Sequence, residues 1–150
     1  WRMEIHELPG LILINDAYNS SPESAVAALR TLALFAQERG GQSWAFMGKM
    51  HELGASSQTH HEEIGTLATE LGIDNLVCIG APEYARGITA DSQTAVHLMA
   101  EKVEAQKLVN QMSAGDVVLV KASRAERLEE LAIEIERIWM ARNLTEEGER

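Results

Sequence analysis

The fold is decided by the stretch LILINDAYNSSP, residues 11–22, in which an apolar run gives way to a polar turn and then to a helix start. Leu11–Ile14 is apolar at successive positions, so both faces of the strand that it predicts would be buried. This pattern is typical of a parallel sheet covered by helices on both sides. Ser21 and Pro22 are preferred where a helix begins, so a helix should follow the polar turn directly.

The same succession of apolar run and helical stripe recurs along the chain. Buried strands are predicted at Trp44–Met47, Leu76–Ile79 and Val117–Val120, with a weaker one at Ala95–Met99. Helices are predicted for Pro22 to Glu38, about His60 to Leu71, Lys102 to Met112 and about Arg124 to Arg142. Met3–Glu7, before a Leu-Pro-Gly turn, predicts an antiparallel edge strand. We therefore expect one three-layer α/β domain over residues 1–145, with a mostly parallel, Rossmann-like sheet, and a solvated tail at 146–150.

Two capping boxes are predicted to begin helices. Thr59 is followed by Glu62, and Ser123 by Glu126, at the spacing that lets each pair satisfy free backbone N–H groups. The second box places the start of the last helix directly after a predicted strand. Such a helix start is a favourable place for an anion.

Composition narrows the class of protein. The 150 residues include 13 Lys and Arg against 23 Asp and Glu, for a formal net charge of −10, so nucleic acid is not expected as a partner. The single cysteine, Cys78, lies in an apolar run and is expected to be buried packing. No apolar stretch approaches the ~18 residues that span a bilayer, and no signal peptide is recognisable. We expect a cytoplasmic protein without membrane insertion.

Polar segments follow the buried strands, at residues 15–22, 48–54, 80–82 and 121–124. Ligands bind beyond the carboxyl ends of the strands in an open α/β sheet, so a site is expected there. No G-x-G-x-x-G, phosphate loop or nucleophile elbow is present, so the domain should not hold a triphosphate by itself. His60 and His61 would point about 100° apart on a helix, which favours solvated side chains over a metal site.

Three of these strand ends resemble motifs of one family, the D-alanyl-D-alanine-adding Mur ligases. Residues 14–24 resemble its aspartate-x-tyrosine-asparagine element, and residues 118–124 its lysine-glycine-serine-arginine strand end. Residues 48–54, with His61 downstream, resemble its glycine-x-methionine-x-glutamate-leucine-glycine element. Trp1–Glu4 resembles the junction after the family's central ATPase domain. The chain departs from these motifs at Asn15, Ser21, Lys49 and Ala122. The resemblance implies the third domain of such a ligase, with two preceding domains outside this chain.

The resemblance implies nucleotide contacts for Asp16, Tyr18, Asn19 and Arg2. Asp16 would accept hydrogen bonds from ribose hydroxyls, and Tyr18 and Asn19 would pack on the ribose and adenine. Arg2 would reach the transferring phosphate from the interdomain junction. From the residues alone, Asp16 can equally be a turn cap, Tyr18 and Asn19 turn residues, and Arg2 a solvated charge.

The implied substrate contacts are Ser123, Arg124, Lys121 and Met50. The helix start at Ser123 and the guanidinium of Arg124 would bind the carboxylate of the incoming dipeptide. Alternatively, Ser123 serves only as a helix cap. Lys121 ends a buried strand, where either a substrate charge or a salt bridge would explain a lysine.

The implied reaction is the ATP-dependent joining of D-alanyl-D-alanine to UDP-N-acetylmuramoyl-tripeptide through an acyl phosphate, in peptidoglycan synthesis. ATP and Mg2+ would belong to the full-length enzyme, with no catalytic residue and no metal ligand in this domain, which should be inactive alone. The alternatives are a sibling Mur ligase, a folylpolyglutamate synthase, a receiver-like signalling domain or a stand-alone interaction module. The receiver is disfavoured because Gly48-Lys49 and Gly80 stand where a phospho-accepting aspartate would be needed.

Overall fold

A six-stranded sheet forms the centre of the computed structural model, which describes residues 3–148. The strands are β1 (Glu4–Leu8), β2 (Leu11–Asp16), β3 (Ser43–Gly48), β4 (Asn75–Ile79), β5 (Ala95–Met99) and β6 (Val117–Lys121). Their order across the sheet is β1-β2-β6-β3-β4-β5. Only the β1–β2 pair is antiparallel, as the hairpin pattern predicts.

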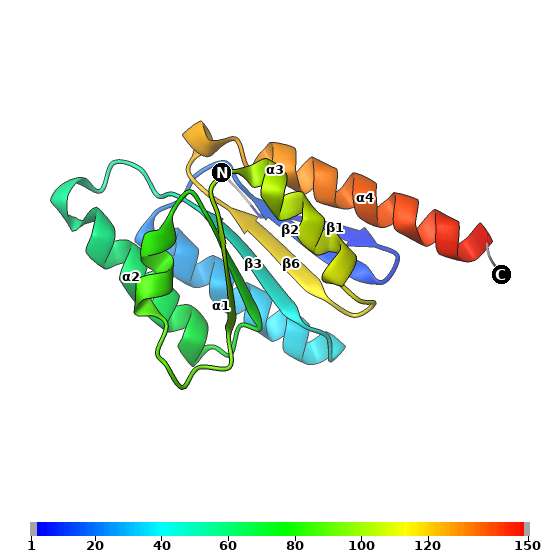
Figure 1. Cartoon of the computed structure of the whole chain (residues 1–150), viewed down its shortest axis with the longest axis horizontal. Coiled ribbons are helices and arrows are strands. Elements are labelled where there is room, and N and C mark those ends of the chain that lie inside the picture. The colour runs from blue at the N-terminus through cyan, green and yellow to red at the C-terminus, as the bar shows by residue number, and fades with distance from the viewer. Residues whose placement is uncertain (1–2, 149–150) are drawn as a thin grey trace.

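Helices cover both faces of this sheet (Figure 1). The α-helices are α1 (Pro22–Arg39), α2 (Ser57–Glu70), α3 (Lys102–Ala105) and α4 (Glu129–Gly148). Four short 3-10 helices complete the fold: η1 (Gly54–Ser56), η2 (Pro82–Gly87), η3 (Gln106–Gln111) and η4 (Arg124–Glu126). α1 and α2 pack on one face, and α3 and α4 on the other. The predicted three-layer, mostly parallel α/β architecture is confirmed.

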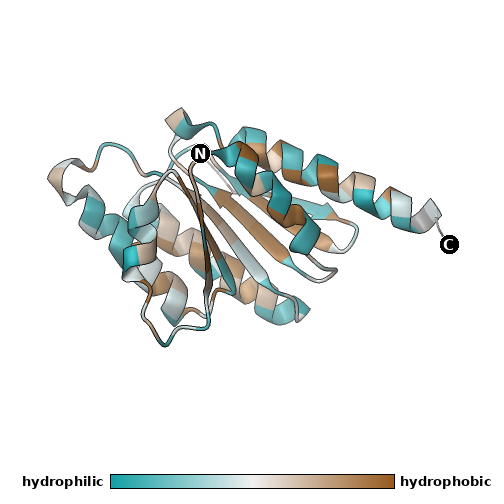
Figure 2. Ribbon diagram, viewed as in Figure 1, coloured by the Kyte–Doolittle hydropathy of each residue, from teal (hydrophilic) through white to brown (hydrophobic). Residues whose placement is uncertain are grey.

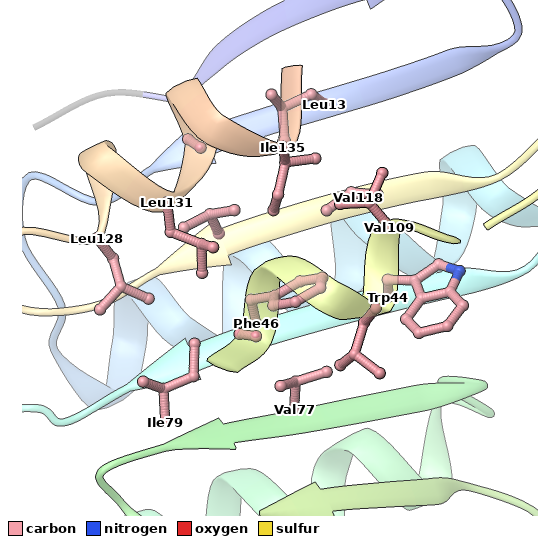
Figure 3. Packing of buried hydrophobic residues seen from close by; sticks show 14 of the residues in the cluster. Leu13, Trp44, Phe46, Val77, Ile79, Val109, Val118, Leu128, Leu131 and Ile135 are labelled. Carbon is pink, nitrogen blue, oxygen red and sulfur yellow. The ribbon is translucent and has the colours of Figure 1, made fainter. Parts of the chain in front are cut away.

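The core consists of two apolar layers separated by the sheet. Every residue of β3, β4 and β6 is buried, because alternate side chains of each strand enter opposite layers. The strands are accordingly apolar throughout, whereas the helices carry apolar residues mainly toward the sheet (Figure 2). Figure 3 shows the layer beneath α4, where Leu131 and Ile135 meet Phe46 and Val118 of the sheet.

Several predicted helix boundaries are wrong. α2 begins at Ser57 with Ser56 as its N-cap, so Thr59 lies inside the first turn and does not cap it. The segment predicted as a helix from Lys102 to Met112 is α-helical only to Ala105 and continues as a 3-10 helix. At the C-terminal end, α4 continues to Gly148, beyond the predicted end at about Arg142.

The last helix starts five residues later than predicted. Residues 124–126 form the isolated turn η4, and α4 begins only at Glu129. Between them, Arg127 takes a left-handed conformation with a φ of 54°, which interrupts a right-handed helix. The Ser123 hydroxyl makes no capping bond, so the predicted capping box is absent. Within residues 3–148, no helix has the length and apolar content to cross a membrane.

Candidate functional site

The carboxyl ends of β2, β6 and β3 are adjacent, because these strands are parallel neighbours in the sheet (Figure 1). Their three following segments, residues 16–20, 49–53 and 122–126, therefore meet at one edge. We call this edge the rim. Hydrogen bonds connect each of the three rim segments to another, as the positions of the polar strand-end residues predict.

A buried ion pair joins the last residue of β6 to the segment after β2. The Lys121 ammonium donates to Asp16 Oδ2 at 2.8 Å and to the Asn19 carbonyl at 2.9 Å. Lys121 is only 1% exposed. Burial lowers the pKa of Lys121, and the hydrogen bond and the charge of Asp16 oppose that shift. The Lys121 side chain is thus a salt-bridge partner of Asp16, which is one of the two explanations that the sequence left open, and its contact with the substrate stays a prediction.

Tyr18 and Asn19, two of the residues predicted to contact a nucleotide, lie in the polar segment directly after β2. Asn19 Oδ1 accepts the backbone N–H of the next residue, Ser20, at 2.9 Å. Tyr18 is 47% exposed, and its ring lies 5.2 Å below the Arg124 guanidinium carbon. Arg124 Nη1 also donates to the Tyr18 hydroxyl at 3.4 Å. Tyr18 of this segment and Arg124 of η4 thus place an aromatic ring and a cation together at the surface. The predicted phosphate contact, Arg2, lies outside the described residues.

Ser123 joins the segment after β6 to the segment after β3. Its backbone N–H donates to the Lys49 carbonyl at 3.1 Å, and its hydroxyl accepts the His51 N–H at 2.8 Å. The hydroxyl is thus used across the rim and not as a helix cap. Gly48 permits this approach, because a Cβ there would lie 2.7 Å from Ala122 Cβ. The ends of β3 and β6 can therefore touch directly beneath the rim.

The Met50 side chain is buried. It is 0% exposed and packs in the layer beneath α1 and α2. In this structure the side chain therefore serves as packing, and the substrate contact predicted for it stays a prediction. Its backbone N–H is also buried and donates to His61 Nε2 at 3.0 Å.

His61 of α2 binds the rim from below, and its burial was not expected. It was expected to be solvated, but it is 1% exposed and lies against the ring of Tyr84, with 4.8 Å between ring centroids. The Tyr84 hydroxyl, also buried, donates to the Gly48 carbonyl at 2.7 Å. A signal was present in the sequence: His61 stands three and seven residues before Ile64 and Ala68, on the buried stripe of α2.

Among residues 3–148, no group of three or more His, Cys, Asp or Glu side chains is arranged to hold a metal ion. The rim exposes the ring of Tyr18 and the guanidinium of Arg124, and the carboxylate of Asp16 lies largely buried at its base. Such an arrangement can bind and orient a polar, anionic ligand.

The chain is similar to one family and to several of its members. Residues 1–124 match the family described as "Mur ligase, glutamate ligase domain". The UDP-N-acetylmuramoyl-tripeptide--D-alanyl-D-alanine ligase of Mycobacterium tuberculosis is 37% identical over an alignment of 139 residues, with 79% of this chain and 27% of that protein covered. The ligase of the same name from Bacillus subtilis is 34% identical over 126 residues, with 81% and 27% covered.

A solved structure shares the fold. The MurF ligase of Thermotoga maritima, in complex with ADP, superposes with a TM-score of 0.76 and 30% identity over 92% of this chain and 31% of that one. The chain thus spans about a quarter of the length of the curated relatives described above, 27% in each case.

Proposed function

The chain belongs to the Mur ligase family, and we propose that it is the C-terminal domain of a ligase that joins D-alanyl-D-alanine to UDP-N-acetylmuramoyl-tripeptide. The observation that carries this proposal is the rim, where three strand-end segments are hydrogen-bonded to one another. Each segment holds residues that resemble a motif of the dipeptide-adding ligases. A shared position at one edge of the sheet is what a single binding surface requires.

The nucleotide half of the proposed site is built on Asp16. Lys121 binds Oδ2 of this carboxylate, so the remaining oxygen can accept a ribose hydroxyl while the buried cation holds the group in place. Tyr18 provides a ring against which the sugar or base can pack, and the polar side chain of Asn19 lies beside it at the exposed turn.

The dipeptide half is built on Arg124 and Ser123. The guanidinium of Arg124 is a fixed cation on an exposed turn and can pair with the carboxylate of the dipeptide. Ser123 holds the segment after β3 against the segment after β6, so both sides of this subsite are ordered. Nucleotide and amine would thus be brought to neighbouring positions on one rim, which favours reaction by proximity.

The chemistry itself would take place on the other domains of the ligase. The terminal carboxylate of the tripeptide attacks the γ-phosphorus of ATP, giving an acyl phosphate and ADP. The dipeptide amine then attacks the carbonyl carbon, the C–N bond forms, and phosphate leaves as the amine loses a proton. We propose that ATP and Mg2+ are held chiefly by those domains, and that this domain alone orders the rim without turning over substrate.

A chimeric ligase tests this proposal. This chain would replace the segment that it matches in the Mycobacterium tuberculosis relative, and phosphate release would be measured with ATP, the tripeptide substrate and D-alanyl-D-alanine. We expect release with the dipeptide and none from the isolated chain. Arg124→Gln should raise the dipeptide KM by about tenfold through the lost charge-assisted bond. Arg137→Gln, which removes an exposed guanidinium on α4 paired with Glu134, is the matched control.

Two outcomes would contradict the proposal. Turnover with diaminopimelate or lysine but not with the dipeptide would assign the chain to a sibling ligase. Micromolar ATP affinity of the isolated chain in calorimetry would contradict the division of labour between domains.

A further inference from the structure

Four consecutive residues at the end of β3 are each held by another element of the fold. The Gly48 carbonyl accepts the Tyr84 hydroxyl, and the Lys49 carbonyl accepts the Ser123 N–H. The Met50 N–H donates to His61, and the His51 N–H donates to the Ser123 hydroxyl. The backbone of residues 48–51 is therefore clamped from two sides, by Ser123 from β6 and by His61 and Tyr84 from the helical layer.

The His61 contacts define the protonation of its ring. Nε2 accepts the Met50 N–H at 3.0 Å, so that nitrogen carries a lone pair and no proton. The ring proton of the neutral side chain is then on Nδ1, which donates to the Ser57 carbonyl at 2.6 Å. Both ring nitrogens are thus committed to backbone groups, one in the rim segment and one in the first turn of α2. His61 ties these two segments together.

An apolar residue at position 61 would fill the same space as His61 but could not accept a hydrogen bond. It would leave the Met50 N–H buried without an acceptor, which is a costly state for a backbone amide. The backbone is also strained directly after residues 48–51, because Glu52 has a φ of 63°, in the left-handed region. A strained conformation at a non-glycine residue persists only where neighbouring contacts stabilise it. The hydrogen bond from the Met50 N–H to His61 is one such contact.

We infer that His61 is a positioning residue for the dipeptide half of the rim. It acts through the Met50 amide: it fixes the backbone of residues 48–51, from which Lys49 is exposed at the rim and to which Ser123 is bonded. The expected effect of His61 on kinetics rests on the proposed function. The expected effect on structure does not: a side-chain acceptor on α2 protects the Met50 amide.

Two substitutions separate hydrogen bonding from packing. His61→Asn places an amide near the position of Nδ1, so it can keep the bond to Ser57 but is too short to accept the Met50 N–H. His61→Gln extends an amide oxygen to the position of Nε2 and can keep the Met50 bond. His60→Asn is the matched control, since His60 is the adjacent residue of α2 and makes only a 3.8 Å contact with Glu63.

The first readout is structural and uses this chain alone. In the parent protein the ring-nitrogen NMR shifts of His61 should be those of the Nδ1–H tautomer. Hydrogen exchange at the Met50 amide should accelerate about tenfold or more in His61→Asn, as expected for one lost buried bond, and by much less in His61→Gln. Tyr84→Phe, which leaves His61 in place, provides a second variant if His61→Asn does not fold, and it should also accelerate this exchange.

The second readout is kinetic and uses the chimeric ligase. His61→Asn should raise the dipeptide KM by about tenfold while the ATP KM stays within about twofold, and His61→Gln should recover most of the loss. Equal effects of Asn and Gln on the Met50 amide, or an Nε2–H tautomer in the parent, would overturn the inference. An inactive parent chimera would instead count against the proposed function, because the exchange experiment on this chain does not depend on it.

Discussion

Lys121 is one of the few charged side chains of this protein that is almost fully buried, and its ammonium is shared between Asp16 and the Asn19 carbonyl. Removing one member of a buried ion pair leaves the other as an uncompensated charge away from water. At the scale of single residues, the stability of the rim should therefore depend on this pair more than on the exposed charges around it.

We predict that Lys121→Met lowers the free energy of unfolding by about 3 kcal/mol, because the methionine fills the space but leaves the Asp16 carboxylate unpaired. Urea unfolding measures this change. The double variant with Asp16→Asn should recover a large part of the loss, and Lys107→Met, at an exposed lysine, should change stability by less than about 0.5 kcal/mol. A Lys121→Met variant as stable as the parent would show that the pair contributes nothing.

The residues of the rim were predictable to different degrees. Asp16, Ser123 and Arg124 follow apolar strands, so the topology of a parallel sheet was enough to bring them together. The burial of Met50 was not predictable, because it depends on how the segment after β3 folds back under α1 and α2. The burial of His61 could have been predicted from the buried stripe of α2, but its partner could not, because a backbone amide leaves no trace in the sequence.

At the scale of elements, α2 packs unusually closely on η2. Gly65 lies in the middle of α2, and a Cβ there would be 1.9 Å from the Tyr84 carbonyl oxygen. The reverse contact is as close, since a Cβ on Gly87 would be 1.9 Å from the Glu62 carbonyl oxygen. This approach brings Tyr84 into the core, where it contacts His61 and Gly48.

Gly65→Ala should therefore destabilise the protein by about 1–3 kcal/mol, although alanine is the better helix former, because backbone atoms must move to admit the methyl group. Gly148→Ala is the control: it is also in a helix, but a Cβ there meets nothing within 4 Å, and it should change stability by less than about 0.5 kcal/mol. Thermal unfolding of both variants measures the difference. Equal melting temperatures would contradict the close contact.

Strands were easier to predict than helix boundaries. The central strands are apolar at every position because both of their faces are buried, and that pattern depends on sequence alone. The start of α4 depends instead on tertiary contacts. Ser123 has the spacing of a capping residue, but its hydroxyl accepts the His51 amide, and Arg127 breaks the helical path. A competing partner elsewhere in the fold thus overrode a valid local signal.

At the scale of the whole molecule, the two apolar layers protect ionisable groups that would otherwise titrate in mild alkali. Burial, followed by the charge of Glu83, raises the pKa of Cys78 from its ordinary value of 9.0 to about 12. Burial also raises the pKa of Tyr84, and the nearby charges of Cys78, Glu83 and Glu126 act in the same direction. Both groups lie in or beside the layer beneath α1 and α2.

These shifts predict a loss of stability in alkali. Above about pH 9 the unfolded chain releases the Cys78 proton while the native protein keeps it, so the unfolded state binds fewer protons and stability falls as pH rises toward about 12. Cys78→Ala removes this contribution and leaves those of Tyr84 and Lys121. Between about pH 8.5 and about pH 10.5, the parent should therefore lose about 2 kcal/mol relative to Cys78→Ala, whatever their difference at neutral pH. Urea unfolding of both proteins across this range measures the change, and parallel curves would show that Cys78 titrates normally in the native state.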